Sequence, residues 1–112
     1  VLVVDDEKDL CELACTWLES LGYETRAVHS PAQALPLLEG GRFKVLFTDV
    51  VMPGGMDGLE LARRAKAGQP GLHVVLASGY ARALADQTDL PGPLVHKPYR
   101  KIDLERQFAQ LR

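Results

Sequence analysis

Five short apolar runs alternate with segments in which apolar residues recur at helical spacing, and no other feature restricts the fold as strongly. This alternation is typical of strand–helix units wound around a parallel sheet. The expected strands cover residues 1–4, 23–28, 45–48, 74–77 and 94–95. The apolar run at 45–48 suits a central strand that is buried on both faces. The predicted fold class is therefore α/β.

Five helices are expected around residues 10–21, 31–39, 59–67, 81–86 and 102–111. The buried stripe of the first helix is expected to contain Leu10, Leu13, Ala14, Trp17, Leu18 and Leu21. Gly22 ends that helix, and Ser30 with Pro31 begins the second, although Pro36 is unfavourable inside it. The fourth helix is short and weakly patterned. The apolar positions of the last helix are Ile102, Leu104, Phe108 and Leu111.

Length and composition predict one domain over residues 1–112, because 46% of the residues are hydrophobic and 25% are charged. The net charge of −2 argues against a nucleic-acid partner, which requires a clustered basic face. No apolar run approaches the ~18 residues that span a bilayer. Cys11 and Cys15 have no histidine or further cysteine nearby, so we expect reduced thiols in a cytoplasmic protein. Because the chain starts directly in a strand, we expect it to be part of a longer protein.

Reactive side chains follow four of the apolar runs. These groups are Asp5-Asp6-Glu7, Asp49, Ser78 and Lys97. The carboxyl ends of parallel strands share one edge of the sheet, where ligands of open α/β folds bind. Carboxylates, a hydroxyl and an ammonium that meet at this edge would form a divalent-cation and phosphoryl site.

Elementary electrostatics supports that interpretation. Two carboxylates about 4 Å apart repel each other by roughly 4 kcal/mol at an effective dielectric constant near 20, so they stay ionised together only beside a cation. Mg²⁺ prefers a few carboxylate oxygens together with waters and phosphate oxygens. Phosphoryl transfer needs charge neutralisation and positioning more than covalent machinery, and a lysine ammonium suits a phosphoryl oxygen.

Four motifs in this order resemble the receiver domain of two-component response regulators. They are VLVVDDE, VLFTDVVMPGGMDG, VVLASGY and LVHKPY, and the similarity covers essentially the whole chain. The resemblance implies a doubly wound, flavodoxin-like sandwich in which five helices flank a five-stranded parallel sheet of order 2-1-3-4-5. The MPGGMDG, SGY and HKPY segments look more like receivers attached to sensor histidine kinases, as in hybrid kinases, than like receivers of transcription factors.

The resemblance also implies roles for individual residues. Asp49 matches the phosphoacceptor, and Mg²⁺ would be held by Asp5, Asp6, Asp49 and the backbone carbonyl of Val51. Ser78 and Lys97 match the residues that contact the phosphoryl group. The peptide bond before Pro98 matches the cis bond of the family, which would aim Lys97.

The implied function is a signalling receiver, not an enzyme, although a parent chain could be a hybrid histidine kinase. A sensor histidine kinase or a histidine phosphotransfer protein would donate the phosphoryl group from a phosphohistidine. The aspartyl phosphate would switch the face formed by the fourth helix, fifth strand and fifth helix, and would then hydrolyse slowly. No nucleic-acid binding and no membrane segment are expected, and homodimerisation is left open.

The chain departs from the commonest receiver pattern at three places. Gly54-Gly55 stands where one residue is usual, Ser78 replaces the commoner threonine, and Leu94 replaces an aromatic residue that rotates on activation. A leucine cannot make that swing, so Tyr80 and Tyr99 join Leu94 as candidate neighbours of the switch.

Each site residue taken alone also has a structural interpretation. An aspartate such as Asp5 after a strand is often a helix cap, and Lys97 alone would be an ordinary surface charge. Asp57 is expected to cap a helix rather than bind a ligand. The histidines are expected to be structural or at the surface, and they are His29, His73 and His96.

Two other functions remain as alternatives. Phosphatases that resemble haloacid dehalogenases also form an aspartyl phosphate, but they need a second aspartate two residues later, where this chain has Val51. A degenerate receiver that acts only as a binding surface would gain no stability from Mg²⁺.

Overall fold

The computed structural model describes residues 1–52, 56–79 and 90–111. In this part of the chain the strands are β1 (Leu2–Val4), β2 (Arg26–Val28), β3 (Val45–Asp49), β4 (His73–Ser78) and β5 (Leu94–His96). The helices are α1 (Lys8–Ser20), α2 (Pro31–Glu39), α3 (Gly58–Gly68) and α5 (Lys101–Ala109). The helix expected over 81–86, Tyr80 and the pair Gly54-Gly55 lie outside the described residues.

The five strands form one parallel sheet in the order β2-β1-β3-β4-β5, which confirms the expected topology. All residues of β3 are buried, as the apolar run at 45–48 predicts for a central strand. The edge strands β2 and β5 are each partly exposed. Strand β2 is shorter than the predicted 23–28, because only its last residues pair with β1.

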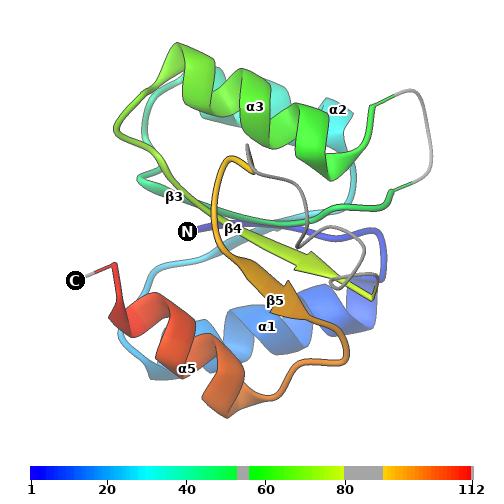
Figure 1. Cartoon of the computed structure of the whole chain (residues 1–112), viewed down its shortest axis with the longest axis vertical. Coiled ribbons are helices and arrows are strands. Elements are labelled where there is room, and N and C mark those ends of the chain that lie inside the picture. The colour runs from blue at the N-terminus through cyan, green and yellow to red at the C-terminus, as the bar shows by residue number, and fades with distance from the viewer. Residues whose placement is uncertain (53–55, 80–89, 112) are drawn as a thin grey trace.

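Helices cover both faces of the sheet, with α2 and α3 on one side and α1 and α5 on the other (Figure 1). Successive residues of β1 point to opposite faces, so Leu2 and Val4 join the core under α2 and α3. Val3 joins the other core, with Phe47 of β3 and Phe108 of α5. The result is the three-layer sandwich that the alternation of strands and helices predicts.

Helix α1 buries a narrower stripe than the sequence predicts. Its buried residues are Cys11, Ala14 and Leu18, whereas 42% of Leu13 is exposed. Leu13 lies two positions after Cys11, a rotation of about 200° that turns it toward solvent. Ile102 of α5 is likewise exposed, although it was expected among the apolar positions of that helix.

The helix starts follow the expected capping chemistry. The Ser30 hydroxyl accepts a hydrogen bond from the Gln33 amide at 3.2 Å, and Pro31 is the first residue of α2. The Asp57 carboxylate accepts one from the Glu60 amide at 2.9 Å. Asp57 is therefore the cap of α3, as predicted.

Candidate cation and phosphoryl site

The carboxyl edge of the sheet gathers the residues that the sequence singles out. Asp5 and Asp6 directly follow β1, and Asp49 is the last residue of the neighbouring strand β3. Ser78 is the last residue of β4, and Lys97 directly follows β5. The strand order reverses between β1 and β3, which makes this edge the position where doubly wound folds bind ligands.

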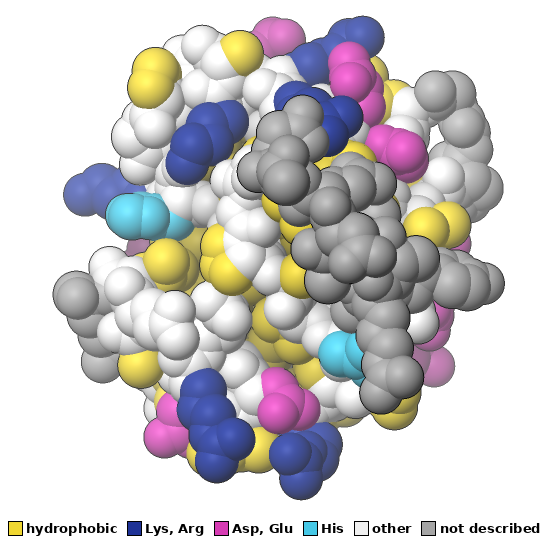
Figure 2. Space-filling model, in the orientation of Figure 1, with side chains coloured by type: hydrophobic (Ala, Val, Ile, Leu, Met, Phe, Trp, Pro, Cys, Tyr) yellow, Lys and Arg dark blue, Asp and Glu magenta, His cyan; other side chains and the backbone are white. Residues whose placement is uncertain are grey.

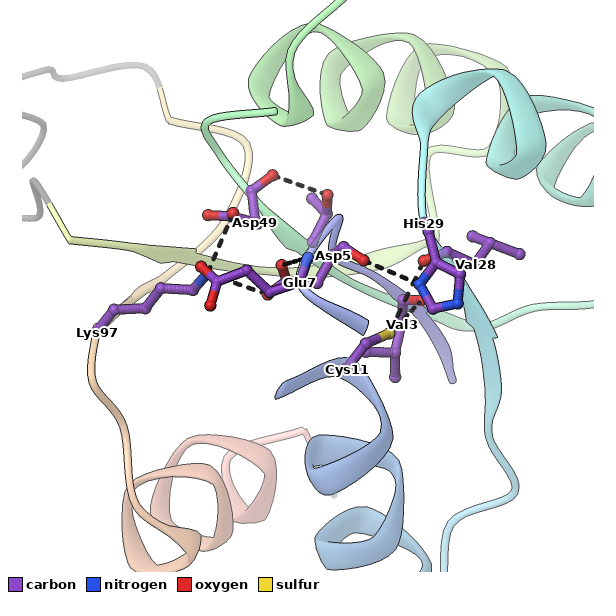
Figure 3. Close-up of polar contacts among 9 residues, drawn as sticks. Val3, Asp5, Glu7, Cys11, Val28, His29, Asp49 and Lys97 are labelled. Atoms are coloured by element: carbon purple, nitrogen blue, oxygen red, sulfur yellow. Dashed lines mark hydrogen bonds and ion pairs between the residues drawn. The ribbon is translucent and has the colours of Figure 1, made fainter. Parts of the chain in front are cut away.

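The ammonium of Lys97 lies among three carboxylates (Figure 3). Its Nζ is 3.0 Å from Asp5 Oδ2, 3.1 Å from Asp49 Oδ2 and 3.5 Å from Glu7 Oε1. Only 13% of the Lys97 side chain is exposed, so it is not the ordinary surface charge of the alternative interpretation. Burial alone would lower the Lys97 pKa, but the ion pairs with Asp5 and Asp49 outweigh burial and raise it.

The acidic residues form a compact cluster. Asp5, Asp6 and Asp49 each offer a carboxylate oxygen, and these atoms all lie within 4.8 Å of one another. Burial, reinforced by the charges of Asp5 and Asp6, raises the pKa of Asp49 to about 6 although Lys97 opposes the shift. Burial also raises the pKa of Asp5, against hydrogen bonds from the Glu7 amide and Lys97. One ammonium therefore does not fully compensate these carboxylates.

A divalent cation fits this donor set. The three aspartates supply hard oxygen ligands, which Mg²⁺ prefers, and Asp6 is exposed, so solvent can reach the cluster. The site opens into a hollow of about 430 Å³, whose lining residues are Asp6, Glu7, Asp49, Val51, Gly79 and Lys97. This space admits a phosphoryl group beside a hydrated ion.

Backbone contacts hold the ends of the strands in place around the cluster. The Lys97 amide donates to the Ser78 carbonyl at 2.9 Å, which ties the end of β5 to the end of β4. Ser78 is fully buried. The Thr48 hydroxyl donates to the Asp49 carbonyl at 3.0 Å, inside the sheet. The main chain beneath the carboxylates is therefore well anchored.

Two residues near the site were absent from the sequence-based assignment. Glu7 was recognised only as part of the acidic run, and its carboxylate contacts Lys97. His29 was expected to be structural or at the surface, and it has a structural contact, since its Nδ1 lies 3.0 Å from the carbonyl oxygen of Asp5. Its position directly after β2, the strand beside β1, was the available signal. His73 and His96 are exposed, as expected.

The candidate switch neighbours lie in different surroundings. Tyr99 is buried in the core, with its ring 5.6 Å from that of Phe47 and 6.3 Å from that of Trp17. Burial raises its pKa. Leu94 is half-buried and packs against the core beneath α2 and α3. The Lys97–Pro98 peptide is cis, as the resemblance implies.

Fold and site together define a doubly wound α/β protein with an acidic cluster, which could bind a cation, and a lysine at the carboxyl edge of its sheet. The family model for the response regulator receiver domain matches residues 1–90. The response regulator receiver protein CpdR of Brucella abortus (strain 2308) is 33% identical over 114 residues, which cover 99% of this chain and 94% of CpdR. The chain therefore belongs to the response regulator receiver domain family of two-component signalling.

Solved structures agree with this assignment. The response regulator TrrA of Thermotoga maritima, in complex with Mg²⁺-BeF, matches with a TM-score of 0.88 and 27% identity over 99% of this chain and 96% of TrrA. The receiver domain from the hybrid histidine kinase CckA matches with a TM-score of 0.81 and 29% identity, covering 97% and 94% of the two chains. This chain spans less than a fifth of several longer curated relatives.

No helix in residues 1–52, 56–79 and 90–111 combines the length and apolar character needed to cross a membrane.

Proposed function

We propose that residues 1–112 form a single receiver domain that accepts a phosphoryl group on Asp49 from a phosphohistidine. The donor would be a sensor histidine kinase or a histidine phosphotransfer protein. The observation that carries the proposal is the position of the Asp49 carboxylate, 3.1 Å from the Lys97 ammonium and inside the cluster with Asp5 and Asp6. The accepting group, a cationic partner and a set of metal ligands are thus contiguous.

In the proposed reaction, an ionised Asp49 oxygen attacks the phosphorus atom of the phosphohistidine. A P–O bond forms, the P–N bond breaks, and the imidazole of the donor leaves with its electron pair and takes up a proton. The Lys97 ammonium would contact an oxygen of the incoming phosphoryl group and neutralise part of its negative charge, because it already lies beside Asp5 and Asp49. Asp5, Asp6, Asp49 and the carbonyl of Val51 would hold Mg²⁺, which supplies further neutralisation of the phosphoryl oxygens.

The aspartyl phosphate is proposed to return slowly to the resting state. A water oxygen attacks the phosphorus atom, the P–O bond to Asp49 breaks, and inorganic phosphate leaves. This cycle is self-directed chemistry on one side chain rather than turnover of an external substrate. A phosphatase is disfavoured because Val51 occupies the position of the required general acid.

Phosphorylation would reach the surface through the ends of β4 and β5. Ser78 and Lys97 would both contact the phosphoryl group, and their backbones already share the hydrogen bond of 2.9 Å. A movement of either residue is therefore passed to β5 and onward to α5. Figure 2 shows that surface, with hydrophobic side chains in its middle and a group of charged side chains over α5. We propose β5 and α5 as the described part of the output face.

A receiver domain can be a separate protein or part of a longer one. Receivers of this size occur as nearly whole proteins, as in CpdR, and within hybrid kinases, as in CckA. We propose that this domain is part of a hybrid kinase and that it lies in the cytoplasm. Both cysteines are free, which agrees with a reducing compartment.

The proposed function is tested by labelling the protein with acetyl phosphate, with and without Mg²⁺. We expect a Mg²⁺-dependent mass increase in the wild type and none in Asp49→Asn. Asp57→Asn is the matched control, because asparagine caps a helix as well as aspartate does and labelling should persist. An unlabelled wild type, or an equal adduct on Asp49→Asn, would reject the proposal.

A receiver that serves only as a binding surface is separated by thermal unfolding. Saturating Mg²⁺ should raise the melting temperature of the wild type, since a ligand that binds only the folded state stabilises it. An unchanged melting temperature would favour the binding-surface alternative.

A further inference from the structure

The backbone of Asp5 is hydrogen-bonded to the end of β2 on two sides (Figure 3). Its amide donates to the Val28 carbonyl at 3.2 Å, and its own carbonyl lies 3.0 Å from His29 Nδ1. A carbonyl oxygen can only accept a hydrogen bond, so Nδ1 carries the hydrogen and donates it. The imidazole therefore contacts the metal-binding loop through the main chain rather than through a carboxylate.

That carbonyl belongs to the peptide that joins Asp5 to Asp6. Because a peptide is planar, a fixed C=O also fixes the direction in which the chain enters Asp6. The Asp5 carboxylate has restraints of its own, since it accepts from the Glu7 amide at 2.9 Å and from Lys97 at 3.0 Å. Asp6 is exposed, so packing restrains it little, and the orientation of the preceding peptide matters more for its side chain.

His29 is itself held at the junction of β2 and α2. Its backbone amide donates to Gln33 Oε1 at 2.8 Å, while the Gln33 amide donates to the Ser30 hydroxyl. The imidazole is only partly exposed. A short turn with two hydrogen bonds thus places the imidazole beside the loop after β1.

We propose that His29 is a positioning residue of the cation site, which holds the Asp5–Asp6 peptide in the orientation that binds Mg²⁺. This inference rests on the proposed function. Without the imidazole, water takes over the Asp5 carbonyl and the peptide can rotate. Loss of one such hydrogen bond is expected to weaken Mg²⁺ binding about fivefold.

The test is calorimetric titration of the whole chain with MgCl₂ alone, above the pKa of Asp49. The amide nitrogen of asparagine lies where His29 has Nδ1, whereas that of glutamine lies one carbon further out. His29→Asn should therefore keep the wild-type affinity, while His29→Gln and His29→Ala lose about fivefold. His73→Ala is the control, because His73 is exposed at the opposite end of the strands.

Unchanged Mg²⁺ affinity in both His29→Ala and His29→Gln would overturn the inference while leaving the proposed function intact. Equal losses in His29→Asn and His29→Ala would also overturn it, since the donor at Nδ1 would then be irrelevant. A wild type that binds no Mg²⁺ would reject the proposed function and this inference together.

Discussion

At the scale of single residues, the site is a cluster of negative charge with too little compensation. Lys97 contacts Asp5, Asp49 and Glu7. Asp6 belongs to the same cluster and adds a further negative charge. Burial is the main reason that the pKa of Asp49 rises to about 6, and the charges of Asp5 and Asp6 add to the shift. The arrangement favours an arriving cation, at a cost to the stability of the metal-free protein.

The raised pKa of Asp49 predicts a pH-dependent stability. The folded protein binds this proton more tightly than the unfolded chain, so the contribution of Asp49 to the stability of the metal-free protein should be lost as pH rises from the ordinary value of 3.8 to about 6. Above about pH 6 the Asp49 proton no longer stabilises the folded protein. Asp49→Asn cannot ionise, so it should melt higher than the wild type above pH 6, by about 4 °C for each kcal/mol.

Thermal unfolding in the presence of a chelator measures this difference across the pH window. The advantage of Asp49→Asn should disappear below the ordinary pKa of an aspartate, where the wild-type carboxyl is protonated in both states. If the melting temperatures of Asp49→Asn and the wild type differ by the same amount at every pH, the raised pKa of Asp49 is contradicted.

At the scale of elements, the start of α3 is packed directly against the end of β3. The Gly58 amide donates to the Val50 carbonyl at 2.8 Å. A Cβ on Gly58 would overlap the carbonyl of Asp49 and approach the Thr48 hydroxyl. The absent side chain of one residue therefore allows the helix to support the strand that ends in the proposed phosphoacceptor.

This close approach predicts opposite effects for two glycines of the same helix. Gly58→Ala forces backbone to move and should destabilise the protein by about 3 kcal/mol. A Cβ on Gly68 meets nothing within 4 Å, so Gly68→Ala should be neutral or stabilising by up to ~1 kcal/mol. Urea unfolding measures the free energy of unfolding of both variants. Equal values would contradict the prediction, because α3 could then move to accommodate the new Cβ without loss of stability.

At the scale of the whole molecule, the site and the proposed output face belong to one connected edge of the sheet. Strands β3, β4 and β5 are adjacent, and the Lys97 amide bonds the Ser78 carbonyl across the last pair. A hollow of about 450 Å³ lies between β5 and α5, with Leu94 and Arg106 among its lining residues.

Beryllofluoride with Mg²⁺ should reveal this coupling in the amide resonances. We expect shifts near Asp49 and also along Leu94–His96 and Lys101–Ala109, because the ends of β4 and β5 move together. Asp49→Asn provides the matched control and should show neither set. Shifts confined to the loops that carry Asp5, Asp6 and Asp49 would mean that the proposed output face is wrong.

The strands could be predicted from their apolar runs, and the gathering of Asp5, Asp6, Asp49 and Lys97 could be predicted from the parallel order of those strands. The apolar run at 45–48 became the buried β3, and Asp49 and Lys97 met because parallel strands end at one edge. The capping roles of Ser30 and Asp57 were equally local, since each depends on a hydrogen bond within one turn.

Beyond the residues that end neighbouring strands, only the tertiary structure decided which contacts form between elements. The exposure of Leu13 depends on how α1 is rotated against the sheet, and helical spacing leaves that rotation open by a residue or two. The contact of His29 with Asp5 and the fit of Gly58 against Asp49 need the packed positions of neighbouring strands and helices. Local sequence determines what each element is, whereas packing determines what each element touches.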